Sequence, residues 1–131
     1  MLTLDTSGVL AAADKRDRSH RGAIAALADE ASMVIPAVIL AETTYMLRRR
    51  LGPVAERAFL EGLIEGEPLV DQETVLPRVL SLVAKYEDLV LSFSDAAVVA
   101  CAERHGGRIL TLDRRDFDVV AHGEGTITIV P

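Results

Sequence analysis

Four acidic residues stand in or next to apolar stretches of the chain, where a carboxylate needs a specific reason to be. The four are Asp5, Glu42, Asp95 and Asp113. Burying an unpaired carboxylate is costly unless it finds a partner, caps a helix or binds a cation. Because Mg²⁺ and Mn²⁺ prefer oxygen ligands, the set predicts a divalent-cation site if the fold brings the four together.

Each acid taken alone also has an ordinary structural interpretation. Asp5, Asp95 and Asp113 stand where a helix or turn is expected to begin, and an acidic cap or first-turn residue is favourable there. Glu42 lies within a predicted helix, so its alternative is an exposed position. These alternatives weaken when the acids are considered together, because Asp5 and Asp113 follow two predicted strands and Asp95 opens the helix that leads to the second strand.

Short apolar runs bounded by turn residues predict the strands. They are Leu2–Leu4, Met33–Ile35, Arg108–Leu112 and Thr126–Val130, with Leu69 and Val70 as a fifth candidate. Apolar residues at helical spacing, together with start and stop signals, predict the helices. They are Asp17–Ala31, a segment with Pro36 in its first turn that ends at Gly52, a third opened by Pro53, Thr74–Glu87, and a helix that starts at Ser94, runs through Ala96–Arg104 and stops at Gly106 and Gly107.

The alternation of strands and helices predicts an α/β fold. Because the strands are continuous apolar runs, the sheet is expected to be parallel and covered on both faces. We therefore expect a three-layer α/β/α sandwich with a central parallel sheet of four or five strands. The 131 residues fit one domain, residues 1–131. Ligands of such sheets bind at the carboxyl ends of the strands, where Asp5 and Asp113 are placed.

The charge balance argues against holding a polyanion by overall attraction. Lys and Arg number 14 against 20 Asp and Glu, a formal charge of −6, and aromatic residues make up only 4%. A nucleic-acid partner would therefore need metal ions or local arginines. Arg114 and Arg115 beside Asp113 are the candidates for substrate binding, and their alternative is ordinary solvated charge.

The chain carries no sign of secretion or membrane insertion. Its N-terminus lacks a basic segment before the first apolar run, and the longest uncharged stretch, residues 31–41, falls short of the roughly 20 residues that a transmembrane helix needs. The single cysteine, Cys101, cannot form an internal disulfide. We therefore expect a cytoplasmic protein with no membrane association.

Four motifs together give the chain a family resemblance. They are Leu4-Asp5-Thr6-Ser7, Ala41-Glu42, Ser94-Asp95-Ala96-Ala97, and the segment from Gly107 to Phe117 with its Thr-x-Asp-x-x-Asp-Phe ending. In this order and spacing the chain resembles a PIN domain, most similar to the VapC-type toxins. The resemblance implies a metal-dependent endoribonuclease that hydrolyses RNA with metal-activated water, and it covers the whole chain.

The resemblance also assigns roles to individual residues. Asp5 and Asp95 would be the principal ligands of Mg²⁺ or Mn²⁺, Asp113 a third acid, and Glu42 a ligand or water-positioning carboxylate. Asp116 matches a more variable acid of the family. The hydroxyls that would orient carboxylates or phosphate are those of Thr6, Ser7 and Thr111. The implied partners are an RNA substrate (tRNA, rRNA or mRNA), a cognate antitoxin protein and a second copy of the chain in a homodimer.

Two other functions compete with this interpretation. Asp5 after an apolar strand would suit a phosphoaspartate enzyme, but Ser7 stands where a second aspartate is expected and no lysine follows Lys85. The other rival is a catalytically silent PIN-like module that binds RNA or a protein. Such modules usually arise by loss of site acids, and all four acids are present here.

Overall fold

A five-stranded parallel sheet forms the centre of the protein in the computed structural model, which describes residues 1–131. The strand order is β3-β2-β1-β4-β5. The strands are β1 (Leu2–Leu4), β2 (Met33–Pro36), β3 (Leu69–Asp71), β4 (Arg108–Leu110) and β5 (Thr128–Val130). All neighbours pair in parallel, so their carboxyl ends meet at one edge of the sheet. The predicted parallel α/β fold is confirmed, with five strands.

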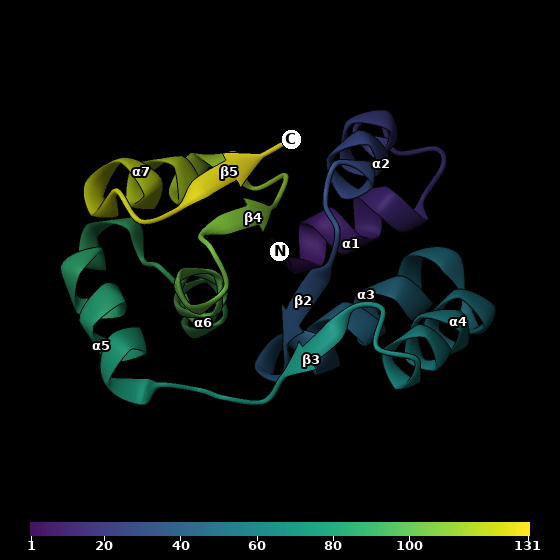
Figure 1. Cartoon of the computed structure of the whole chain (residues 1–131), viewed down its shortest axis with the longest axis horizontal. Coiled ribbons are helices and arrows are strands. Elements are labelled where there is room, and N and C mark those ends of the chain that lie inside the picture. The colour runs from purple at the N-terminus through teal and green to yellow at the C-terminus, as the bar shows by residue number, and fades with distance from the viewer.

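Seven helices cover the two faces of this sheet. They are α1 (Thr6–Ala13), α2 (His20–Ala28), α3 (Leu40–Leu51), α4 (Pro53–Ile64), α5 (Leu76–Lys85), α6 (Phe93–Arg104) and α7 (Arg114–Glu124). In Figure 1, α1 to α4 lie on one side of the sheet and α5 to α7 on the other. None of the helices combines the length and the apolar composition that a membrane span requires.

The centre of the sheet is fully covered. All three residues of β1 are buried, and the strand lies between β2 and β4, so no edge or face of it meets solvent. Helix α6 packs on β1, β2 and β4, and every residue from Ala96 to Ala102 is buried. A helix that is apolar all round is typically a core helix. Because the end of α6 leads into the amino end of β4, the first turn of α6, with Asp95, lies at the carboxyl edge of the sheet.

On the opposite face, α1 approaches β4 closely. Gly8 is buried, and a Cβ built on it would lie 2.5 Å from the Leu110 carbonyl oxygen. Only glycine therefore permits this approach of helix to strand without a shift of the backbone.

Several predicted boundaries were wrong. Pro36 ends β2 rather than opening a helix; a short 3₁₀ helix, Ala37–Ile39, follows it and α3 begins at Leu40. Helix α2 covers only part of the predicted Asp17–Ala31, and β4 stops at Leu110. Pro77 does lie in the first turn of α5, as the helix over this region requires. Helix α6 begins before Ser94: Ser92 caps it, its Oγ accepting the Asp95 amide hydrogen at 3.0 Å.

Candidate active site

The carboxyl ends of β1 and β4 place two of the predicted acids side by side. Asp5 follows the last residue of β1, and Asp113 lies three residues beyond the end of the neighbouring β4. The Asp5 amide donates to the Leu110 carbonyl at 3.1 Å, which continues the pairing of the two strands to the base of the site. The sheet itself therefore fixes the position of Asp5 relative to the segment that carries Asp113.

Two hydroxyl groups hold the Asp5 carboxylate. Its Oδ2 accepts hydrogen bonds from Thr111 Oγ1 at 2.8 Å and from Ser7 Oγ at 3.0 Å. The same hydroxyls accept backbone hydrogens from the segment after β4, with the Leu112 amide 2.9 Å from Ser7 Oγ and the Asp113 amide 3.0 Å from Thr111 Oγ1. Ser7 and Thr111 thus link one carboxylate to the loop that presents another.

Thr6 occupies a different place from the other predicted hydroxyls. It is buried, and its Oγ1 lies 2.8 Å from Oγ1 of Thr43 on α3 rather than on a carboxylate. This contact ties the start of α1 to the first turns of α3. Glu42, next to Thr43, is exposed in the first turn of α3. It lies outside the closest group of acids.

Three acids form that closest group. Carboxylate oxygens of Asp95, Asp113 and Asp116 all lie within 4.8 Å of one another. Asp95 comes from the first turn of α6, Asp113 precedes α7 and Asp116 lies in the first turn of α7. Asp116, which the resemblance matched to a more variable acid of the family, is therefore part of the group, because one helical turn brings it back beside Asp113.

The electrostatics of the group oppose full ionisation. Burial raises the pKa of Asp95 to about 6, with further contributions from the negative charges of Asp5, Asp113 and Asp116. Burial and then the charges of Asp116 and Asp5 also raise the pKa of Asp113, against the opposing effect of Arg115. The charges of these acids disfavour one another, so a positive ion at this position would be stabilised.

The donor set fits a hard divalent cation. It consists of carboxylate oxygens from separate elements, held near one another with repulsion that a cation would relieve. No thiol or imidazole belongs to this group, which disfavours a zinc-type site. The arrangement is suited to holding a divalent cation.

The two predicted substrate arginines differ in their surroundings. The guanidinium of Arg114 contacts both carboxylate oxygens of Asp118, at 3.2 and 3.1 Å, and donates to the Pro131 carbonyl at 2.8 Å. Arg115 is exposed and close enough to Asp113 to lower the pKa of that acid. The Arg114 guanidinium is thus already bonded to Asp118 and Pro131, whereas Arg115 lies near Asp113.

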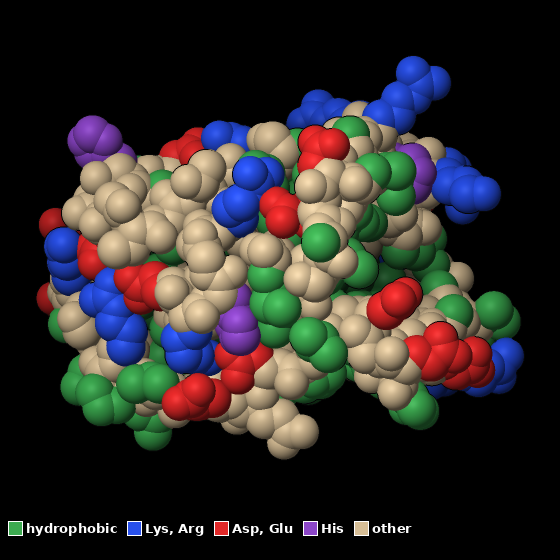
Figure 2. All heavy atoms as spheres, viewed as in Figure 1, with side chains coloured by type: hydrophobic (Ala, Val, Ile, Leu, Met, Phe, Trp, Pro, Cys, Tyr) green, Lys and Arg blue, Asp and Glu red, His purple; other side chains and the backbone are tan.

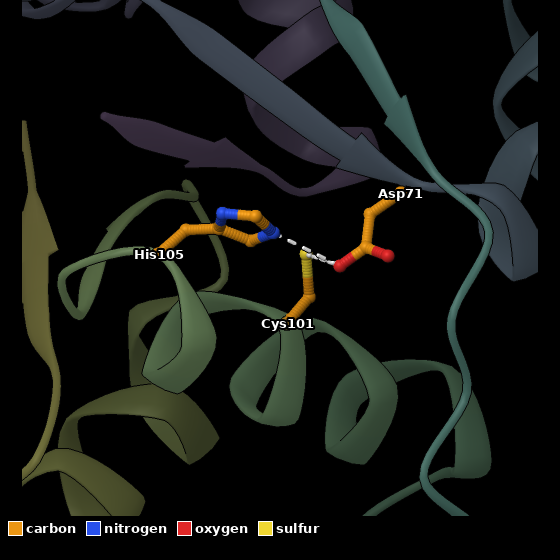
Figure 3. A group of neighbouring side chains, drawn as sticks. All are labelled: Asp71, Cys101 and His105. Atoms are coloured by element: carbon orange, nitrogen blue, oxygen red, sulfur yellow. Dashed lines mark hydrogen bonds and ion pairs between the residues drawn. The ribbon is translucent and has the colours of Figure 1, made fainter.

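A second group of potential metal ligands lies away from these acids. Asp71 at the end of β3 meets Cys101 and His105 of the α6 region, as Figure 3 shows. Its Oδ2 lies 3.0 Å from His105 Nε2 and 3.5 Å from Cys101 Sγ, and accepts Arg104 Nη2 at 2.7 Å. The sequence did not indicate this group, although Cys101 and His105 stand four residues apart at the C-terminal end of α6 and so lie on one face.

The charges of this second group indicate a structural link. Burial acts to raise the pKa of Asp71, but hydrogen bonds from Arg104, the Glu73 amide and His105 outweigh it and lower the pKa to about 2. Burial and the nearby Asp71 raise the pKa of Cys101 to about 12, so its thiol stays protonated. Since the guanidinium already neutralises the carboxylate, the group fastens the edge strand β3 to α6 without needing a metal.

Comparison with known proteins agrees with this geometry. The family model for the PIN domain matches residues 2–123. The chain is 33% identical over 135 residues to Ribonuclease VapC26 of Mycobacterium tuberculosis, covering 99% of this chain and all of that protein.

Two crystal structures share the fold. One is VapC20 of Mycobacterium tuberculosis, a toxin that cleaves the sarcin-ricin loop, with a TM-score of 0.82 and 22% identity over the full length of both chains. The other is FitAcB from Neisseria gonorrhoeae, with a TM-score of 0.66 and 17% identity over all of this chain and 97% of that one. With a family model that matches nearly its whole length and a full-length VapC relative at 33% identity, the chain belongs to the PIN domain family.

Proposed function

We propose that this protein is a metal-dependent endoribonuclease and the toxin of a toxin-antitoxin pair. The observation that carries the proposal is the group of carboxylates from Asp95, Asp113 and Asp116, placed beside Asp5 at the carboxyl edge of the sheet. The similarity to a VapC ribonuclease gives this acidic group its expected chemistry. The substrate is RNA, and the reaction is hydrolysis of a phosphodiester bond.

We assign a separate role to each side chain of the site. Asp5, Asp95 and Asp113 would hold the cation, with Asp116 as an additional acid, and the exposed Glu42 of α3 would position water. Ser7 and Thr111 fix the Asp5 carboxylate through the bonds described above, so its Oδ2 cannot turn away when the site is empty of substrate. Bound Mg²⁺ or Mn²⁺ would activate the attacking water and offset the charge that develops on the phosphate.

A cleavage assay tests the proposal. Antitoxin-free protein is incubated with a mixed tRNA and rRNA pool in Mg²⁺, in Mn²⁺ or in excess EDTA. We expect discrete fragments with either metal, none in EDTA and none with Asp95→Asn. The matched control is Asp88→Asn, which removes an exposed acid of the Glu87–Leu89 turn and should cleave like the parent. Metal-independent cleavage, or full activity of Asp95→Asn, would contradict the assignment.

We further propose that the protein forms a homodimer through α5. An apolar hollow of about 560 Å³ opens along this helix, and its lining includes Leu76, Pro77, Leu80, Val83 and Phe93. Leu80 is 68% exposed, and hydrophobic side chains gather at the lower left of Figure 2, near the start of α5. Exposed apolar surface of this kind typically marks a protein interface. Light scattering should report a dimer for the parent and a monomer for Leu80→Glu.

For the antitoxin we propose the apolar groove between α1, α2 and α4. It has a volume of about 270 Å³ and is lined by nine hydrophobic residues, among them Ile24 and Phe59. An apolar helix face would fill it, and an antitoxin arginine would reach the acids in place of the metal. Ile24→Glu should prevent co-purification with the product of a small neighbouring reading frame, whereas Leu80→Glu should not. Each variant thus serves as the other's control.

A cytoplasmic site of action accompanies this proposal. The buried, free Cys101 requires no oxidising compartment, and the proposed RNA substrates and antitoxin are found in the cytoplasm.

A further inference from the structure

A polar hollow opens beside the candidate active site. It has a volume of about 260 Å³ and seven lining residues, of which only two are hydrophobic. Two of the seven, Ser7 and Leu112, belong to the hydrogen-bond network of the acids: Ser7 Oγ donates to Asp5 and accepts the Leu112 amide hydrogen. The hollow therefore shares a wall with the site where a phosphodiester would be cleaved.

Two arginines reach this hollow from separate elements. Arg18 comes from the loop between α1 and α2, and Arg50 from the last turn of α3. Both are exposed, and neither takes part in a salt bridge. By contrast, Arg48 of the same basic run is paired with Glu56 at 3.4 Å. Arg18 and Arg50 are thus two free guanidiniums that share one polar hollow.

The remaining polar residues of the hollow do not cancel this charge. Asp17 is the one carboxylate among them, and its Oδ1 accepts the Ser19 amide hydrogen at 2.8 Å. Ser19 directly precedes α2, so the hollow also lies at the N-terminal end of a nine-residue helix, where the helix dipole favours an anion. Two guanidiniums and a helix N-terminus outweigh one carboxylate that is already bonded to the backbone.

We propose that this hollow binds an RNA backbone phosphate adjacent to the cleaved one, with Arg18 and Arg50 as its ligands. The inference rests on the proposed ribonuclease function and adds to it the residues that hold the substrate. An arginine fork suits a phosphate, and a local pair of arginines provides attraction that a chain of net charge −6 lacks overall. Figure 2 shows basic and acidic side chains interspersed on the face in view rather than gathered in one basic surface.

The test measures RNA binding separately from cleavage. In the Asp95→Asn background, fluorescently labelled unfractionated tRNA is titrated with protein in Mg²⁺ at a series of KCl concentrations. The affinity falls as salt rises, and loss of one phosphate contact makes the slope of log K against log salt less steep by about 0.7 to 1. We expect that change for the Arg18→Gln/Arg50→Gln double variant, with affinity roughly tenfold weaker. Because both arginines hold one phosphate, the effects of the two single substitutions should not add.

The matched control is the Arg16→Gln/Arg49→Gln double variant. It removes the same charge from positions adjacent or nearly adjacent in sequence, but neither residue lines the hollow. Equal slopes for the two double variants would overturn the phosphate site and leave the proposed function standing. If the parent cleaves no RNA but binds it, the slopes still decide the site while the proposed function fails. Absence of RNA binding by the parent would overturn both.

Discussion

Replacing Asp95 with asparagine should stabilise the metal-free protein while abolishing cleavage. Burial and the neighbouring acids raise the pKa of Asp95 from 3.8 to about 6. A shift of two pKa units corresponds to about 3 kcal/mol between the charged and neutral forms. Asp95 is only partly buried, so solvent screens part of this cost. We expect Asp95→Asn to gain about 1 to 2 kcal/mol in the free energy of unfolding at pH 7.5.

The pH dependence of this gain has a definite sign. An acid whose pKa is higher in the folded state destabilises the fold when it ionises. The cost of Asp95 is absent below pH 4, grows between pH 4 and 6, and is fully present above pH 6. The advantage of Asp95→Asn over the parent should therefore shrink to nothing near pH 4.

Thermal or urea unfolding in EDTA measures the effect. The gain corresponds to roughly 3 to 8 °C in Tm for a chain of this length. Added Mg²⁺ should stabilise the parent more than Asp95→Asn, since it binds the folded site. Asp88→Asn, which removes a carboxylate outside the acidic group, should leave Tm unchanged. An Asp95→Asn protein that is less stable than the parent at pH 7.5 in EDTA would refute the argument that these acids repel one another.

Three further substitutions test the framework around the site. Ser7→Ala removes a donor to Asp5 and should lower cleavage about 10- to 100-fold at saturating Mg²⁺, with a stability loss of about 1 to 2 kcal/mol in urea unfolding. Asp71→Asn should lower the free energy of unfolding by about 2 kcal/mol at pH 7, because the pKa of Asp71 is lowered to about 2 in the folded protein. The parent should lose the same stability in an acid titration as pH falls from 4 to 2. Gly8→Ala places a Cβ against the Leu110 carbonyl and should cost about 1 to 3 kcal/mol in the same unfolding assay.

The sheet could be predicted from sequence because each of its strands is a short apolar run without alternation. This pattern is typical of buried strands such as β1 and β2, and it also marked the edge strands β3 and β5, whose first residues are exposed. The helices were harder where the pattern lacks a polar face. Four of the eight residues of α1 are alanine or glycine and five of its residues are buried, so no helical period marks it. A helix or turn after Asp5 was expected only as an alternative role for that acid.

The error at Pro36 has a local cause. Proline fits both the first turn of a helix and the end of a strand, and the sequence cannot choose between them. In the structure, Pro36 pairs in register with Asp71 of β3, and this pairing extends β2 by one residue. The helix that carries Glu42 therefore starts four residues later than predicted, and Glu42 falls in its first turn.

The candidate site was predictable where strand order alone brings residues together. Asp5 and Asp113 follow adjacent parallel strands, so their proximity follows from the fold class. Contacts between side chains from distant helices do not follow from it. Sequence spacing does not predict how the helices pack against one another. Three features depend on that packing: the Thr6–Thr43 contact, the hydrogen bonds of Asp71, and the hollow shared by Arg18 and Arg50.

The distribution of charge connects these observations into one account of how an acidic protein would hold RNA. The acids at the sheet edge repel one another, and a divalent cation would turn that repulsion into attraction for phosphate. Arg114, which the sequence placed beside the acids, is already bound to Asp118 and the Pro131 carbonyl. Arg18 and Arg50, which form no salt bridge, line the hollow that also contains Ser7 and Leu112. Attraction for the substrate would then come from two places next to Ser7: a cation held by the acids, and the guanidiniums of Arg18 and Arg50. The cation should make RNA binding depend on metal, and the arginines should make it depend on salt.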